Sequence, residues 1–112
     1  NILFGFVLYI LTHLVSNLFQ LCFGSIAGDS ELQTAENRDS AAAAVQNFML
    51  AATSRGLATY WGSCPKGAND PVAEFCGFES DTKVVCIMYL GWATTQVETP
   101  QRPAANITFL EK

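Results

Sequence analysis

The stretch AAAAVQNFMLAATSRGLATYWGS, residues 41–63, decides the fold of this chain. Its first part predicts a helix that begins at Asp39 or Ser40, because either side chain can cap free backbone N–H groups and the alanines that follow favour helix. One face of this helix is apolar, with Val45, Phe48, Met49 and Ala52 at helical spacing. Gly56 ends the helix, and Arg55 in the last turn suits the negative end of the helix dipole.

Downstream of this helix, short elements alternate with turns rich in glycine and proline. Residues 57–61 favour a strand because they include a threonine and two aromatic residues. Residues 62–67 are predicted to form a loop from their Gly and Pro content. Asp70 is a suitable N-cap for a second, shorter helix that Gly77 closes. Residues 83–90 are almost all apolar, which predicts a strand buried on both faces of a sheet.

Upstream of the helix, residues 2–23 carry no formal charge. Residues 2–10 are nearly continuously apolar, as in a buried strand, and from Leu11 to Cys22 the period changes to that of an amphipathic helix. Residues 24–38 are small and polar and predict a loop. A membrane or signal anchor also fits the apolar length, but the polar stripe and the missing flanking cations disfavour it. A foreign or mistranslated stretch is the third alternative.

Charge and cysteine content exclude several classes of protein. The net charge is −4 and the six basic residues are scattered, whereas a nucleic-acid surface needs clustered cations. The four cysteines form no CxxC pair and one histidine does not complete a zinc set, so we expect no metal site. We predict reduced core cysteines in a cytoplasmic protein, with a disulfide pair as the alternative.

Local chemistry predicts no catalytic residue. Walker, GxGxxG, HExxH and GxSxG motifs do not occur in the sequence. Ser63 and Cys64 have no base near them, and His13 lies on the polar face of the expected helix without a carboxylate to orient it. Glu79 and Asp81 fit a solvated turn. A flavin enzyme needs no protein nucleophile, because the cofactor itself performs the hydride chemistry.

Residues 41–63 resemble the helix-then-strand segment of the nitroreductase family, with a small-residue run, a Gln-Asn pair, Ala-Ala, a glycine and a tryptophan in that order. The run PVAEFCGFESDTKVVCIMYLGW, residues 71–92, is similar to the short helix, the turn and the final core strand of that family. The resemblance implies an α+β flavoprotein fold, a homodimer with FMN at its interface, and NAD(P)H as electron donor. The electron acceptor that it implies is a nitro compound, a quinone or a similar small molecule.

The same resemblance implies site residues. Trp61, Gly62 and Ser63 match the family segment that touches FMN. Contact with the nicotinamide cofactor is implied for the end of the helix, at Ala51, Ala52, Thr53, Ser54, Arg55 and Gly56. Family members often carry a basic residue at the position of Gly62, and the Arg-Arg-Ser-type segment of the family does not occur here. We therefore expect the C-terminal part of a nitroreductase-like domain in residues 39–112, preceded by residues 1–38 of unassigned role.

Three functions are compatible with these observations. The first, which we favour, is an FMN-dependent NAD(P)H oxidoreductase of which this chain is a fragment. The second is a small binding domain that residues 2–23 anchor to a membrane. The third is a non-functional remnant whose exposed apolar segment makes it prone to aggregate. The sequence specifies neither the acceptor nor a preference for NADH or NADPH.

Overall fold

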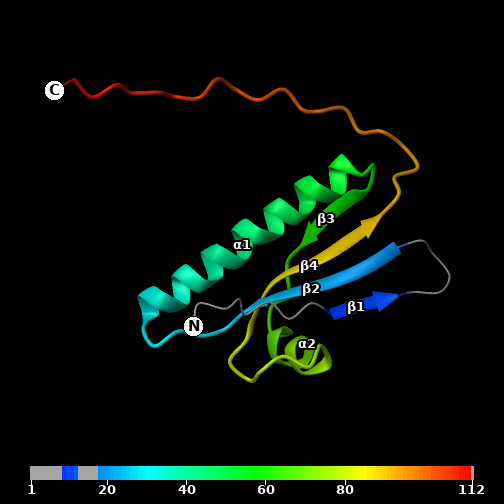
Figure 1. The fold of residues 1–112 in the computed structure, drawn as a ribbon, viewed down its shortest axis with the longest axis vertical. Coiled ribbons are helices and arrows are strands. Elements are labelled where there is room, and N and C mark those ends of the chain that lie inside the picture. Colours follow the sequence, from blue (N-terminus) through cyan, green and yellow to red (C-terminus); the bar gives the residue numbers. More distant parts are fainter. Residues whose placement is uncertain (1–8, 13–17, 112) are drawn as a thin grey trace.

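The computed structural model of this chain describes residues 9–12 and 18–111, which form one antiparallel sheet and two helices (Figure 1). The elements follow in the order β1 (Tyr9–Thr12), β2 (Leu18–Ser25), α1 (Glu31–Ser54), β3 (Ala58–Gly62), α2 (Asn69–Phe75) and β4 (Lys83–Gly91). The strand order in the sheet is β1-β2-β4-β3, and each neighbouring pair is antiparallel. The predicted α+β class is confirmed, as are the strands expected near residues 57–61 and 83–90.

Strand β4 is the central strand of the fold. It pairs with β2 along one edge and with β3 along the other. Cys86 and Met88 have no exposed surface, and Val85 is buried as well. Helix α1 covers one face of the sheet, while α2 packs against the other face near the beginning of β4 (Figure 1). The first part of β4 is therefore covered on both faces, as predicted, whereas its second part is open on the face away from α1, where Tyr89 is exposed.

The larger core lies between α1 and the sheet. Its buried members are Leu21, Phe23, Ala41, Val45, Val85, Cys86 and Met88. Phe48 and Met49 pack against this cluster, and the Phe23 and Phe48 rings meet edge to face with centroids 5.7 Å apart. Val45 is fully buried, and Ala52 is buried one turn before the helix ends. The apolar face predicted for this helix is thus confirmed.

Helix α1 begins earlier than predicted, and the loop expected over residues 24–38 is largely helix. Its N-cap is Ser30, whose hydroxyl accepts a hydrogen bond from the Gln33 backbone N–H at 3.1 Å. The Gln33 side chain in turn accepts from the Asp29 N–H at 2.8 Å. This reciprocal arrangement is close to a capping box and satisfies donors at the helix start. The first turns are polar and exposed, so no apolar periodicity revealed them.

The prediction of an amphipathic helix from Leu11 to Cys22 is wrong for those of its residues that the structure describes. Residues 9–12 and 18–25 are strands, and they pair in a register that sets Tyr9 opposite Cys22. In β2, Leu21 and Phe23 join the core beneath α1, while Cys22 joins the cluster beneath α2. Burial on both faces produced an apolar run with no clear period. Residues 2–8 of the expected strand and His13 lie outside the described residues.

Helix α2 has a different start from the one predicted. Ala68 is the N-cap and makes no side-chain capping bond, so Asp70 is not the cap. Asn69 instead fixes the helix to β4, because its Oδ1 accepts from the Val84 N–H and its Nδ2 donates to the Thr82 carbonyl. Gly77 follows the helix with a φ of +71°, which confirms the predicted stop.

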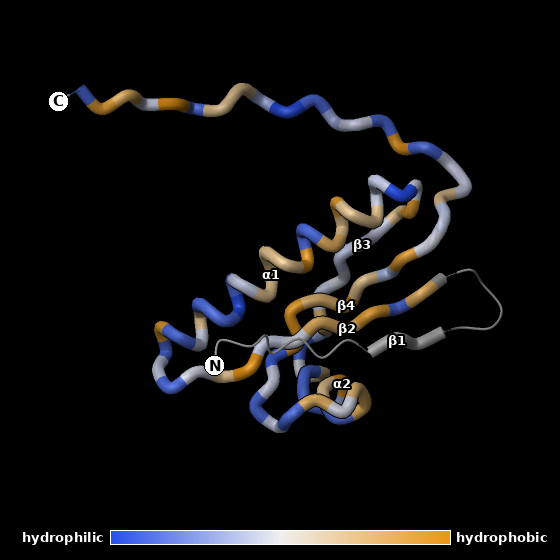
Figure 2. Tube along the Cα trace, viewed as in Figure 1, coloured by the Kyte–Doolittle hydropathy of each residue, from blue (hydrophilic) through white to orange (hydrophobic). Residues whose placement is uncertain are grey.

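Residues 92–111 leave the sheet as an extended segment without helix or strand (Figures 1 and 2). The apolar patch near its end is exposed, at Ile107, Phe109 and Leu110. We predict that this patch docks on another surface, since isolated apolar side chains of this size gain free energy when buried. Among the described residues, none of the helices has the length and hydropathy needed to cross a membrane.

Candidate cofactor-binding site

Two of the predicted FMN contacts lie at the end of β3, on opposite faces of the sheet. Trp61 pairs with Met88 across the strands, and its side chain packs against the core beneath α1. Gly62 is the next residue, so it belongs to the face that α1 does not cover. Trp61 therefore contributes core packing at this strand end, and the other face is the one open to a ligand.

Gly62 lies close to its neighbouring strand. A Cβ atom at this position would lie 2.8 Å from the Ile87 carbonyl oxygen, which is too close for any other residue without a backbone shift. Burial raises the pKa of the Cys86 thiol to about 11, and the neighbouring Gly62 backbone offsets part of this rise. Gly62 thus serves close strand pairing.

Ser63 follows the strand and opens the loop toward α2. Its side chain is exposed, and its hydroxyl makes no hydrogen bond within the described part of the chain. Lys66 in the same loop is exposed as well. The strand end therefore presents one free hydroxyl and, three residues on, one cation. These groups fit a polar ligand edge or a phosphate, and neither is a catalytic acid or base.

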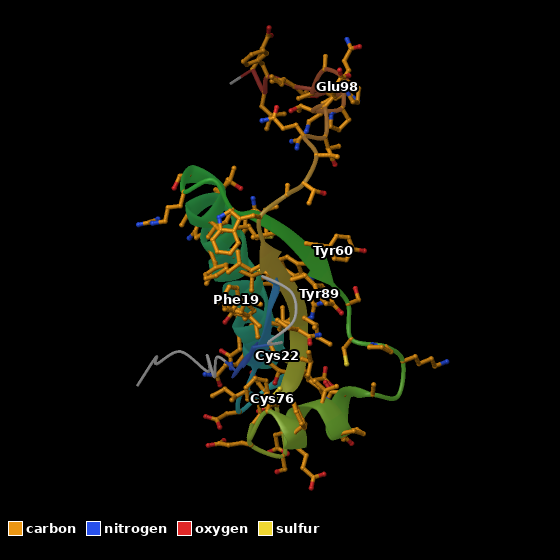
Figure 3. The ribbon with its side chains drawn as sticks, turned by 90° about the vertical axis from the view of Figure 1, so that its right-hand side faces the viewer. Phe19, Cys22, Tyr60, Cys76, Tyr89 and Glu98 are labelled. Carbon is orange, nitrogen blue, oxygen red and sulfur yellow. The ribbon has the colours of Figure 1, made fainter. Side chains whose placement is uncertain are left out.

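Two tyrosines beside Gly62 were not identified from the sequence. Tyr60 and Tyr89 are directly opposite each other in β3 and β4, and their ring centroids are 6.2 Å apart. Both rings lie on the side of the sheet away from Phe19, and Tyr60 is 67% exposed (Figure 3). Gln20 donates from its Nε2 to the Tyr89 hydroxyl at 3.3 Å. Only the strand register brings these residues together, which is why spacing in the sequence missed them.

The second predicted stretch, residues 51–56, forms the end of α1. The Gly56 N–H donates to the Thr53 carbonyl and the Leu57 N–H to the Ala52 carbonyl, with Gly56 at a φ of +76°. This is a Schellman motif. The hydroxyls of Thr53 and Ser54 and the Arg55 guanidinium all bond to carbonyls of the same helix. Of these six residues only Ala52 is buried. The exposed polar side chains mainly donate hydrogen bonds to the carbonyl groups at the end of α1.

The structure does not bring the two predicted stretches into one site. Residues 51–56 precede the first residue of β3, whereas Gly62 and Ser63 lie at its other end (Figure 1). Five residues of strand separate them by roughly 15 Å. A single ligand that touches both would have to lie along the length of β3.

The cysteines are free thiols, and three of them are buried: Cys22, Cys76 and Cys86. Cys64 is half-buried in the loop after β3. Cys22 and Cys76 lie in one buried cluster (Figure 3). Burial chiefly, and this neighbour in addition, raise the pKa of Cys22 to about 12. In the described residues, no group of three His, Cys, Asp or Glu side chains is arranged to hold a metal ion.

Comparison with known proteins assigns this arrangement to a family. The model of the Nitroreductase family matches residues 22–92, which include the second half of β2, both helices and strands β3 and β4. The chain belongs to the nitroreductase family. The match contains all nine residues predicted from the resemblance. A comparison with curated proteins finds no match.

A solved structure supports the same assignment. The nitroreductase-like family protein from Bacillus cereus superposes with a TM-score of 0.68 at 26% sequence identity. The superposition covers 77% of this chain and 46% of the Bacillus cereus chain. The chain thus spans about half the length of that nitroreductase-like protein. The expected nitroreductase-like fold is confirmed.

Proposed function

We propose that this chain is the C-terminal part of an FMN-dependent oxidoreductase that takes electrons from NAD(P)H and reduces nitro compounds, quinones or similar acceptors. The family match over residues 22–92 is the observation that carries the proposal. Nitroreductases generally use FMN and are usually dimers, so the active form is proposed to be a homodimer. We also propose that the nitroreductase-like part extends upstream of residue 39, because the family match begins at Cys22, within β2, and ends at Trp92.

The end of β3 is the proposed FMN contact. The hydroxyl of Ser63 is free to hydrogen-bond a polar edge of the cofactor, while Trp61 holds the strand end on the core. Gly62 keeps this face free of a side chain beside Tyr89. When bound, FMN supplies the hydride-transfer chemistry, and the protein contributes binding and orientation.

The residues present fit the ring of the cofactor better than its phosphate. The exposed Tyr60 and Tyr89 rings form an apolar surface with a polar rim, which suits a planar aromatic ligand. A phosphate needs cations or several free N–H donors. Lys66 is the cation nearest in sequence to Ser63, and one lysine does not by itself meet this need.

The nicotinamide contact is proposed at the end of α1, over Ala51, Ala52, Thr53, Ser54, Arg55 and Gly56. Support for this assignment is the family resemblance of these residues. Their polar side chains already bond to helix carbonyls, so any such contact would use their exposed outer surfaces.

Flavin titration of the purified protein tests the proposed FMN contact. FMN binding should quench flavin fluorescence, and the bound form should absorb at about 450 nm, the ordinary flavin band. Ser63→Asp should weaken FMN binding about tenfold or more, because an ionised carboxylate cannot donate a hydrogen bond and repels the anionic cofactor. Ser80→Asp adds the same charge at an exposed turn between α2 and β4 and should leave the dissociation constant unchanged. Equal affinities of the two variants, or no flavin binding by the unmodified protein, would contradict the proposal.

A further inference from the structure

A second feature, independent of the proposed cofactor contact, lies at the opposite end of α1. An open pocket of about 680 Å³ is formed where the start of α1 faces the paired ends of β2 and β4, and its polar lining includes Ser25, Asp29, Ser30, Glu31, Arg38 and Lys83. Helix α1 has 24 residues and is therefore about 36 Å long, so this pocket is far from Gly56. Neither the family resemblance nor the proposed function uses it.

The first turn of α1 borders this pocket through Ser30, Glu31 and Thr34. The N–H groups of Gln33 and Thr34 bond to Ser30, one to its hydroxyl and the other to its carbonyl. The N–H groups of Glu31 and Leu32 make no hydrogen bond within residues 9–12 and 18–111. Free donors at a helix start carry partial positive charge and attract anions.

Ser25 is the second and independent sign of a ligand. Its residue is only 5% exposed, and its backbone pairs with Lys83 at the end of the sheet. The Ser25 hydroxyl has no hydrogen-bond partner among the residues that the structure describes. Every fully buried side-chain polar atom in that part of the chain does have one, so this hydroxyl keeps an open side. The space that it lines is the pocket.

Two cations complete the arrangement. Arg38 lies two turns after Glu31 on the same face of α1, and Lys83 approaches from β4. Neither cation makes an ion pair within the described residues. The carboxylates of Asp29 and Glu31 also line the pocket, so the formal charges of the lining side chains sum to zero. These carboxylates repel a highly charged anion. A ligand with one oxyanion group fits this balance better than a polyphosphate.

We propose that this pocket binds the oxyanion group of a small ligand, a phosphate or a carboxylate. The Glu31 N–H group and the Ser25 hydroxyl supply its hydrogen bonds, and Arg38 and Lys83 supply the charge. The N-cap Ser30 holds the helix start in the orientation that points these donors at the ligand.

The test is a titration of the ¹⁵N-labelled chain with inorganic phosphate and, separately, with acetate, each against sodium chloride at equal ionic strength. The proposal expects a saturable shift of the Glu31 amide resonance with at least one of the two oxyanions. The stronger ligand identifies the chemistry as phosphate or carboxylate. Shifts that chloride reproduces, or shifts that do not saturate, would overturn the proposal.

Charge variants separate a site from general attraction. Lys83→Gln should weaken oxyanion binding roughly fivefold or more, whereas Arg102→Gln removes one positive charge from the exposed extended segment and should not. Arg38→Gln, at an exposed helix position, provides a second variant if Lys83→Gln fails to fold. An equal loss for Arg102→Gln and for the pocket variants would contradict the proposal. Loss of oxyanion binding with unchanged FMN affinity would leave the proposed function intact.

Discussion

Asn69 and Val84 are joined by a hydrogen bond of 2.8 Å from the Val84 backbone N–H to the Asn69 side-chain oxygen. The nitrogen of the same amide donates to the Thr82 carbonyl at 3.1 Å. One side chain at the start of α2 thus satisfies two backbone groups at the start of β4. The short helix makes no side-chain capping bond of its own, and this link instead ties its first turn to the strand.

Asn69→Ala should lower the free energy of unfolding by about 1–3 kcal/mol, because it leaves a half-buried N–H and a carbonyl without partners. Asn69→Asp retains the acceptor and loses the donor, so its loss should be smaller. Urea denaturation followed by circular dichroism measures both. Asn47→Ala, at an exposed position of α1, is the matched control and should change little. A loss no larger than that of the control would show that the link does not stabilise the fold.

Gly56→Ala should destabilise the protein by about 1 kcal/mol through the backbone alone. The position has a φ of +76°, which a residue with a Cβ adopts at a cost, and no atom lies within 4 Å of the added methyl group. Gly56→Asn should cost less, because asparagine tolerates this conformation. Thermal unfolding distinguishes the two. Equal melting temperatures for all three proteins would contradict the backbone explanation.

Met88→Ala should lower the free energy of unfolding by about 2–5 kcal/mol, since it leaves a cavity beneath α1 at a fully buried position. Leu50→Ala on the outer face of α1 is the control, because Leu50 is 59% exposed. The difference between the two midpoints in urea tests whether the core lies where the structure places it. Similar losses at both positions would be inconsistent with this core.

Alkaline pH should destabilise the fold through Cys22. Its pKa is raised from 9.0 to about 12, so the folded protein holds the thiol proton more tightly than the unfolded chain does. The corresponding stability is fully present below about pH 9 and is lost as the pH rises toward 12. Cys22→Ala removes this titration, so its free energy of unfolding should fall less steeply than that of the unmodified protein between about pH 8 and pH 10. Parallel pH profiles would refute the assignment to this thiol.

Elements whose signals are local were predictable from the sequence. The apolar face around Val45, the glycine stop at Gly56 and the buried run of β4 each depend on residues within a few positions of one another. The resemblance in residues 41–92 also led to the family that the comparison assigns. The Ser30–Gln33 cap was present as a local signal too, but the apolar period used to locate the helix begins more than two turns later.

The sequence by itself determined where the second half of α1, β3 and β4 lie, because propensity, periodicity and glycine conformation act over a few residues. Only the tertiary structure decided that residues 18–25 are a strand, since burial between α1 and α2 removes the period that separates strand from helix. It alone placed Tyr60 against Tyr89 and Ser25 against Lys83. Those pairs are far apart in the chain, and strand register, which depends on the whole packed sheet, sets them side by side.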